Sequence, residues 1–367
     1  MSQTTSQSKP WIVVVGGFLG AGKTTLLLSA SQELERRGLR SALILNDQGE
    51  ALVDTEYASL HGLRHGEVTG GCFCCRFSDL VHVMDDLRRF SPDVIFAEPV
   101  GSCTDISATT LQPLREYSDT YRLAPFTVLV DPERARALLR DDAEQNLKFL
   151  FTKQLEEADL VCFTKSDLNH DFPDINVRNI RQISAKSLQG VAAWLDEVLS
   201  GTISAGSQIL DIDYEQYALS EAALVWLNLR VTLRPEILVS SAMILGPLLD
   251  SLNTDFNAAA ISIVHLKAIV SSPEGFLKAA ICANDQEPVV EGDLNASPSS
   301  TLNLLLNLRA IGLAANVREI VEQNLGKMDI NFTDLQISCF HPAAPKPELR
   351  VAERKTDEPA DTHALST

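Results

Sequence analysis

The clearest chemistry in this sequence lies in a glycine-rich run near the N-terminus, Gly17-Phe18-Leu19-Gly20-Ala21-Gly22-Lys23-Thr24. Its glycines leave the backbone N–H groups free to turn toward phosphate oxygens, which a Cβ would obstruct. Lys23 is expected to reach the β- and γ-phosphates of a nucleotide, and Thr24 to offer its hydroxyl to Mg²⁺. A chance glycine cluster is the alternative, but a match over eight residues argues against it. The residues expected to bind nucleotide here are Gly17, Gly20, Ala21, Gly22, Lys23, Thr24 and Thr25.

A second group with its own chemistry is the triplet Cys72, Cys74 and Cys75. Thiolates so close in sequence can converge on one soft or borderline metal ion, and three ligands leave a tetrahedral ion one open position. Buried small hydrophobes or a redox sensor are the alternatives. The candidate fourth ligands are Glu50, Asp47, His61 and His65. The remaining cysteines are isolated and are expected to be core or incidental residues: Cys103, Cys162, Cys282 and Cys339.

Acidic residues stand after two predicted strands. Glu98 ends an apolar run and is followed by Gly101, so it can hold the Mg²⁺ shell or orient the attacking water, while Gly101 offers a backbone N–H to the γ-phosphate. Asp47 and Glu50 lie in an acidic loop that a mobile switch could bring to the metal or the γ-phosphate. The residues expected to act in catalysis are Lys23, Asp47 and Glu98, and those expected to hold Mg²⁺ are Thr24 and Glu98.

Two further loops bear on the choice of base. Thr164-Lys165-Ser166-Asp167 resembles the Asn-Lys-x-Asp loop of GTPases, with Thr164 in place of Asn. The Asp167 carboxylate can accept hydrogen bonds from both guanine N1–H and the exocyclic amine, a donor pair that adenine lacks. Downstream, Ser184-Ala185-Lys186 resembles the loop that contacts the guanine carbonyl in small GTPases. Together they favour GTP over ATP.

The elements that must position these loops alternate between strands and helices. Apolar strands are expected at 11–15, 39–45, 92–97, 126–130 and 160–163, with helices from the phosphate loop to about Arg37 and from Phe77 to Arg89. This order predicts an α/β fold, a P-loop NTPase parallel sheet with helices on both faces. Each polar motif follows a strand, and the carboxyl edge of such a sheet is where ligands bind.

The bulk composition sets the class of protein. The chain has 367 residues, 45% hydrophobic and 22% charged, with a net charge of −18. This profile predicts two domains of a soluble protein, and its acidity argues against nucleic acid or an anionic membrane as partner. The polar N-terminus has no apolar signal core, so the cytoplasm is the expected compartment, where thiols stay reduced.

With these motifs in order, the sequence resembles the CobW-type family of P-loop GTPases, which includes metallochaperones and metalloenzyme activators. The resemblance covers about Trp11 to Leu199 and departs at Asp47, where the family carries Glu, and at Gln48, where it usually carries an aromatic residue. It implies slow GTP hydrolysis and a transition-metal cargo, zinc or cobalt, on the cysteine triplet. The motifs that carry it are Gly17-Phe18-Leu19-Gly20-Ala21-Gly22-Lys23-Thr24-Thr25, Asn46-Asp47-Gln48-Gly49-Glu50, Gly71-Cys72-Phe73-Cys74-Cys75, Glu98-Pro99-Val100-Gly101 and Thr164-Lys165-Ser166-Asp167.

The C-terminal half carries weaker signals. Strands are expected at 221–233, 260–270, 276–283, 302–311 and 330–340, and helices at 239–252 and 314–325, which predicts a smaller α+β domain of ferredoxin-like type. His265-Leu266-Lys267 on one of these strands could touch a ligand, but a solvated strand face is the expected environment of His265 and Lys267. The predicted divisions are a disordered tail 1–9, a GTPase domain 10–200, a linker 201–220, the second domain 221–340 and a disordered tail 341–367.

Three functions remain open at this point. The first is a metallochaperone GTPase that delivers its ion to a client metalloprotein or cofactor pathway. The second is a GTPase activator of a cofactor-dependent enzyme, such as one using a corrinoid, with no metal cargo. The third is an ATP-using kinase with an incidental cysteine cluster. The sequence names neither the metal, nor the client, nor the oligomeric state.

Overall fold

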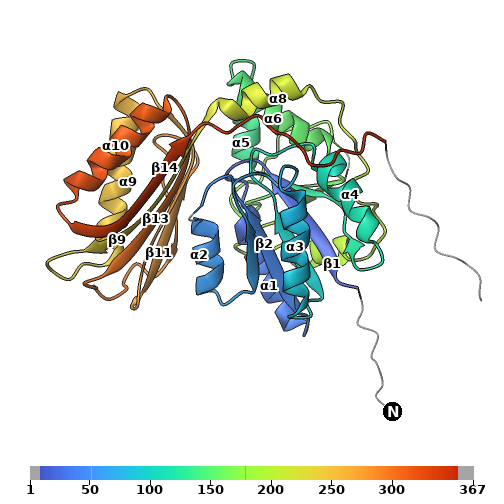
Figure 1. Ribbon diagram of the computed structural model, residues 1–367, viewed down its shortest axis with the longest axis horizontal. Helices are drawn as coiled ribbons and strands as arrows, with labels where there is room; N and C mark the ends of the chain where they lie inside the picture. Colours follow the sequence, from blue (N-terminus) through green and yellow to red (C-terminus); the bar gives the residue numbers. More distant parts are fainter. Residues whose placement is uncertain (1–8, 51, 178, 354–367) are drawn as a thin grey trace, which may run out of the picture.

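The computed structural model describes residues 9–50, 52–177 and 179–353. The predicted N-terminal tail, Lys9 excepted, and residues 354–367 of the predicted C-terminal tail lie outside the described residues. Two sheets stand side by side, each with its own helices (Figure 1). Within the described ranges no helix is both long and apolar enough to cross a membrane.

The first sheet is entirely parallel, and its strands run in the order β3-β2-β4-β1-β6-β7-β8, with β5 beside β1. This confirms the predicted α/β fold. The central strand β1 is buried on both faces, as helices on both sides require. The strands are β1 (Trp11–Gly17), β2 (Ser41–Asn46), β3 (His65–Val68), β4 (Val94–Glu98), β5 (Arg122–Leu123), β6 (Thr127–Val130), β7 (Leu160–Phe163) and β8 (Ile180–Gln182).

The helices of this unit form two layers. Leu26 of α1 and Trp194 of α7 pack on one face of the sheet, whereas Leu80 of α3 and Phe151 of α6 pack on the other. A π-helical turn, Ser107–Leu111, leads into the short α4. The helices are α1 (Lys23–Arg36), α2 (Val53–Leu60), α3 (Phe77–Arg88), α4 (Gln112–Leu114), α5 (Pro132–Leu138), α6 (Gln145–Glu156), α7 (Val191–Val198) and α8 (Tyr214–Ala222).

The second sheet is antiparallel, with its strands in the order β12-β11-β10-β13-β9-β14. Strands β9, β10, β13 and β14 with helices α9 and α10 make the β-α-β-β-α-β unit of the predicted ferredoxin-like type, and β11 and β12 extend its edge. The strand β12 was not predicted. The elements are β9 (Leu224–Arg234), α9 (Ser241–Ala258), β10 (Ser262–Ser272), β11 (Gly275–Ile281), β12 (Val289–Gly292), β13 (Leu302–Ile311), α10 (Ala314–Lys327) and β14 (Asn331–Phe340).

The two faces of the second sheet differ because side chains alternate along a strand. Leu266, Ala268 and Val270 of β10 pack under α9 and α10 in one core. The opposite face looks toward the first unit, where Ile269 and Leu305 meet α2 in a small apolar cluster. Figure 1 shows α2 standing between the two sheets. The switch segment that leads into α2 is therefore pressed against the second sheet.

Two expected flexible segments are in fact packed. Part of the predicted linker forms α8, whose N-cap Asp213 accepts from Glu215 N and Gln216 N. Residues 341–353, predicted to be disordered, run back across the first unit (Figure 1) and are held there by hydrogen bonds described below. Composition suggested disorder because this segment is rich in Pro and charge; long-range backbone contacts override that local preference.

Candidate functional site

The phosphate loop joins β1 to α1 in the conformation that its glycines predict. Gly17, Gly20 and Gly22 have positive φ angles of 131°, 83° and 90°. The Lys23 ammonium lies over the loop and donates to the Gly17 carbonyl at 2.8 Å. Burial lowers the pKa of Lys23, so this site favours the arrival of negative charge beside its ammonium. The loop can take a phosphate group with little backbone change.

Hard oxygen donors gather where a metal beside the phosphates would lie. The Thr24 hydroxyl donates to a Glu98 carboxylate oxygen at 2.9 Å, and Lys23 Nζ lies 4.0 Å from the same carboxylate. Burial raises the pKa of Glu98, and the negative charge of Asp54 raises it further. The buried Asp54 Oδ1 has no hydrogen-bond partner among the described residues. This place therefore holds a hydroxyl and two carboxylates that repel each other, and one carboxylate oxygen has no hydrogen-bond partner among the described residues. Such a set of oxygen donors suits Mg²⁺.

Gly101 lies against the phosphate loop. A Cβ at this position would stand 3.1 Å from Lys23 Nζ and 2.8 Å from Leu19 Cδ2, so a larger residue would collide with the loop. The backbone after Glu98 thus approaches the place expected for the terminal phosphate.

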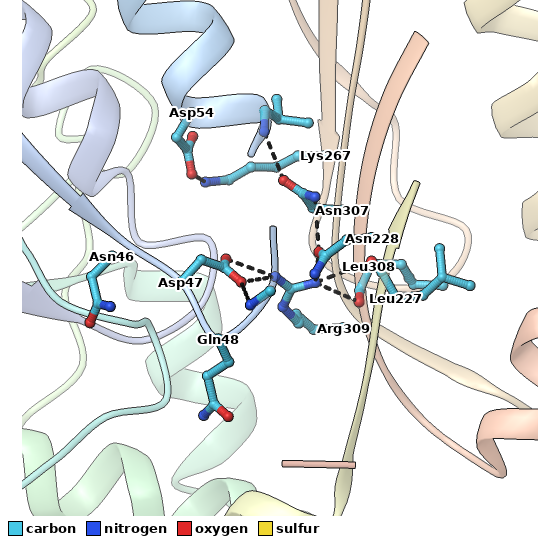
Figure 2. Close-up of polar contacts among 12 residues, drawn as sticks. Asn46, Asp47, Gln48, Asp54, Leu227, Asn228, Lys267, Asn307, Leu308 and Arg309 are labelled. Carbon is cyan, nitrogen blue, oxygen red and sulfur yellow. Dashed lines mark hydrogen bonds and ion pairs between the residues drawn. The ribbon is translucent and has the colours of Figure 1, made fainter. Parts of the chain in front are cut away.

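The switch carboxylate Asp47 is held by the second sheet. Arg309 of β13 donates to both its oxygens, at 2.9 and 2.8 Å (Figure 2). The guanidinium is 4% exposed, stacks at 3.7 Å on the Trp226 ring, and also donates to Asn228. A second, partly buried pair joins Asp54 to Lys267 of β10 at 2.5 Å. Neither cation was predicted to approach the switch, because they lie more than two hundred positions away in the chain.

The two loops predicted to recognise the base are neighbours. Ile183 N donates to Phe163 O, and Ser166 N to Ile183 O, which brings residues 164–167 beside residues 184–186. Ala185 O accepts from Ser29 Oγ on α1, so the second loop is tied to the helix that follows the phosphate loop. Lys165 pairs with Asp131 at 2.5 Å. Asp167 and Lys186 lie at the accessible side of these loops.

The cysteine triplet is compact, and it has a fourth member. Cys72 Sγ lies 2.8 Å from Cys74 Sγ and 3.4 Å from Cys75 Sγ. The Cys103 thiol joins Cys72 and Cys74 in one buried group whose sulfur atoms all lie within 4.8 Å of one another. The expectation that Cys103 is incidental is therefore wrong: the loop after β4 carries it to the triplet. Cys75 is not part of this group of three, although its sulfur lies 3.4 Å from Cys72 Sγ and 3.6 Å from Cys74 Sγ. Thiols converging in this way are typical donors for zinc and related ions.

The thiols share one negative charge unequally. Hydrogen bonds from Cys72 and Cys74 lower the pKa of Cys103 to about 6, whereas hydrogen bonding to Cys103 raises the pKa of both these donors. Hydrogen bonding to Cys72 raises the pKa of Cys75 to about 11. Cys103 is thus the residue that holds a thiolate at neutral pH, and a thiolate is the metal-binding form.

The other candidates for a fourth ligand lie elsewhere. Asp47 is engaged by Arg309. His61 bonds the Tyr57 carbonyl, and His65 that of Leu63. Glu50 is exposed and does not belong to the thiol group. One feature of the sequence could have identified Cys103: it lies five residues after Glu98, at the same edge of the sheet. Its distance along the chain from the cysteine triplet concealed this relation.

A cavity of about 140 Å³ covers the phosphate loop and is lined from both sheets. The first unit contributes Lys23, Thr24 and Glu98 among others, and the second contributes His265, Lys267 and Arg309 among others. The prediction of a solvated face for His265 and Lys267 is wrong, because this face of β10 is covered by the first unit.

Comparison with known proteins agrees with this geometry. Residues 11–189 match the model of the CobW/HypB/UreG nucleotide-binding domain. This part of the chain is similar to that family. The zinc chaperone CobW of Sinorhizobium sp. is 31% identical over 188 residues, which are 44% of this chain and 52% of the relative. The zinc chaperone YjiA of Escherichia coli is 27% identical over 186 residues, 48% and 55% of the two chains. The chain spans about half the length of the curated relatives it matches.

Among solved structures, the zinc-bound YjiA GTPase from E. coli is 16% identical, with 87% of this chain and 98% of that chain covered and a TM-score of 0.30.

Two side chains tie the thiols of this domain to its phosphate and switch loops. Asn46, next to Asp47, donates to Gly71 O at 2.7 Å and accepts from Phe73 N at 3.0 Å. Gln154 donates to Gly101 O at 3.0 Å and to Cys103 O at 2.9 Å. A displacement of either loop would therefore move a ligand sulfur.

The C-terminal segment closes the thiol group from outside. Lys346 N donates to Cys75 Sγ at 3.2 Å, and Glu348 N donates to Cys74 O at 2.9 Å. Arg350 anchors the segment on buried Asp105 at 2.8 Å. Helix α8 adds a further contact, since Tyr217 donates to Cys103 Sγ at 3.5 Å.

Proposed function

We propose that this protein is a GTP-binding and hydrolysing metallochaperone, which carries a transition metal on its thiols and delivers it to a client metalloprotein or cofactor pathway. The observation that carries the proposal is the double attachment of the thiols. Cys72 and Cys74 follow a segment bonded to the switch, and Cys103 belongs to the loop of Glu98 and Gly101. The family of the domain and its zinc-chaperone relatives support the same reading.

The nucleotide proposed for this site is GTP. Its phosphates would lie in the loop from Gly17 to Thr25, with Lys23 leaving the Gly17 carbonyl for the β- and γ-phosphates. Gly101 N–H would face the γ-phosphate. Residues that would surround the guanine are Thr164, Lys165, Asp167, Ser184, Ala185 and Lys186, and the adjacency of their two loops supports this assignment.

The proposed Mg²⁺ site uses Thr24 and Glu98, and the structure adds Asp54, whose second oxygen lacks a partner among the described residues. When bound, the ion would neutralise charge on the phosphates. Lys23 would stabilise charge that develops on the γ-phosphate. Asp47 is held by Arg309 at the edge of the same cavity, from which it can orient water.

The proposed cargo is zinc, with cobalt as the other candidate, because thiolates bind both and availability decides between them. A buried group of three thiols, with one position of a tetrahedral ion left open, favours a cargo role over the alternative, an activator of a corrinoid-type enzyme without metal. The cytoplasm is the proposed compartment, and thiols would stay reduced there and remain able to bind a metal.

Binding and release would be coupled through the two attached loops. Nucleotide exchange would shift the switch at Asn46 and the backbone at Gly101, and each shift would reach a sulfur through one hydrogen-bonded side chain. By linkage, the metal would then raise affinity for GTP by the same factor by which GTP raises affinity for the metal.

The test is metal affinity of the full chain with a non-hydrolysable GTP analogue, with GDP and with no nucleotide, for Zn²⁺ and Co²⁺. The expected result is an affinity about 5- to 150-fold higher with the analogue, the usual range of coupling between sites. The thiolate-to-Co²⁺ absorption band gives a readout independent of hydrolysis. Equal metal affinity in the three states would refute the coupling, and stronger binding of ATP than GTP would refute the base assignment.

A further inference from the structure

The second sheet presents a cationic wall to the phosphate cavity. Lys267, Lys278 and Arg309 line it from three adjacent strands, β10, β11 and β13. Burial lowers the pKa of the neighbouring His265 well below its usual value, so that ring is neutral. Phosphate groups entering the cavity would meet Lys23 from one side and these cations from the other.

The three cations differ in how many partners they already have. Arg309 is stacked on Trp226 and donates to Asp47, Asn228 and two backbone carbonyls. Lys278 lies 3.8 Å over the Tyr57 ring and pairs with Glu291 at 3.1 Å. Lys267, by contrast, donates one hydrogen bond among the described residues, to Asp54 (Figure 2). An ammonium has three donors, so Lys267 has the capacity for a further acceptor.

Lys267 lies at the end of the cavity where Thr24 and Glu98 would hold Mg²⁺. Its partner Asp54 is the carboxylate whose charge also acts on Glu98. The positive charge of Lys267 in turn lowers the pKa of both Lys23 and Glu98, so the three groups lie within electrostatic range. This end holds Thr24 and Glu98, whereas the base loops at 164–167 and 184–186 lie beside Phe163 and Ile183.

We propose that Lys267, supplied by the second sheet, contacts the γ-phosphate of the bound nucleotide and so distinguishes GTP from GDP. The inference rests on the proposed function and extends it. GTP differs from GDP by one phosphate group at this end of the site, and the partly buried ammonium of Lys267, which lines the cavity beside Asp54, is placed to donate to it. Because Lys267 sits on a strand paired on both sides, the contact reports nucleotide state to the whole second sheet.

The experiment compares affinities for a non-hydrolysable GTP analogue and for GDP in the wild-type chain, Lys267→Met and a control, Lys327→Met. Lys327 forms a surface pair with Asp255 on the far side of the second sheet. Lys267→Met is expected to weaken analogue binding about 10- to 100-fold, the range of one charge-assisted hydrogen bond, with GDP affinity within about 3-fold. Lys327→Met should match the wild type.

Equal losses for the analogue and GDP, or no loss for either, would overturn the proposal. The affinities are measured again in EDTA. If Lys267→Met loses its discrimination between the analogue and GDP only in the presence of Mg²⁺, Lys267 acts through Asp54, and that result would also overturn the proposal. Lys267→Gln keeps a donor for Asp54 and is expected to show the same loss if the Met variant does not fold. A wild-type chain that binds neither nucleotide would instead refute the proposed function.

Discussion

The nucleotide end and the thiol end of the first unit are covered in different ways. Charged side chains of the second sheet close the nucleotide end, with Arg309 and Lys267 on the switch carboxylates. The thiol end is closed by the backbone of residues 346–348 and by Tyr217. Cations suit a cavity for phosphate, and neutral N–H and O–H donors suit a group of thiolates. The two ends share one short loop, from Glu98 to Cys103, so a change at one end reaches the other within five residues.

The strongest test of the charged cover is Arg309→Met, which keeps an apolar stem on Trp226 and removes the guanidinium. Asp47 then remains beside the second sheet without its cation. Breaking a buried pair in this way costs about 3–5 kcal/mol of unfolding free energy. Urea denaturation of the variant and the wild type measures the loss.

The matched control is Arg318→Met, which breaks an exposed pair with Glu322 one helical turn away. Its expected cost is at most about 0.5 kcal/mol. If Arg309→Met also lowered the unfolding free energy by less than about 1 kcal/mol, Arg309 would not hold the switch carboxylate Asp47 in solution. The proposed difference between the covers of the nucleotide end and the thiol end would then be wrong.

At the thiol end, Cys103→Ser is the corresponding test. If four ligands share the roughly 10–16 kcal/mol typical of structural zinc sites, one of them accounts for about 2.5–4 kcal/mol, or about a 60- to 900-fold loss of zinc affinity. Competition with a chromophoric chelator measures it. Cys339→Ser is the control, since that thiol lies on β14 and bonds Ala314 O. Equal affinity of the two variants would remove Cys103 from the site.

The two ends also differ in how far the sequence predicts them. The phosphate loop is contiguous, so its residues, its glycine conformations and its place between β1 and α1 follow from local rules. Parallel strands likewise explain why Glu98 meets Thr24. Cys103, Lys267 and Arg309 reach their sites through tertiary packing, which periodicity does not encode.

The same limit applies to the elements themselves. Long apolar runs such as β1 and β13 were predicted, whereas α2, which buries three of its eight residues, was not. Its partner surface, Ile269 and Leu305 of the second sheet, lies far along the chain. Segment 341–353 was predicted to be disordered, and this prediction was wrong for a similar reason. The segment is ordered by its contacts with Cys74, Cys75 and Asp105.

The smallest expected effect concerns the loop that both ends share. Glu157 is fully buried beside the residues that follow this loop, and it accepts from Thr104 Oγ1 at 3.0 Å and from Ser107 N at 3.1 Å. Burial raises the pKa of Glu157 from 4.5 to about 8. The folded chain thus keeps a proton that the unfolded chain has lost, and the contribution of this group to stability is full below about pH 4.5 and falls as pH rises to about 8.

Glu157→Gln removes the titration and keeps an acceptor oxygen for one of the two donors, so any cost of the lost hydrogen bond is the same at every pH. Within this pH window, the unfolding free energy of the wild type should fall relative to the variant by about 1.4 kcal/mol for each pH unit, the linkage for one proton. Denaturation midpoints of both proteins at pH 5, 6 and 7 provide the measurement. A constant difference across these three values would show that Glu157 is ionised in the folded state. Water would then have to reach the loop between Glu98 and Cys103, and the thiol end would not be sealed from solvent as its cover implies.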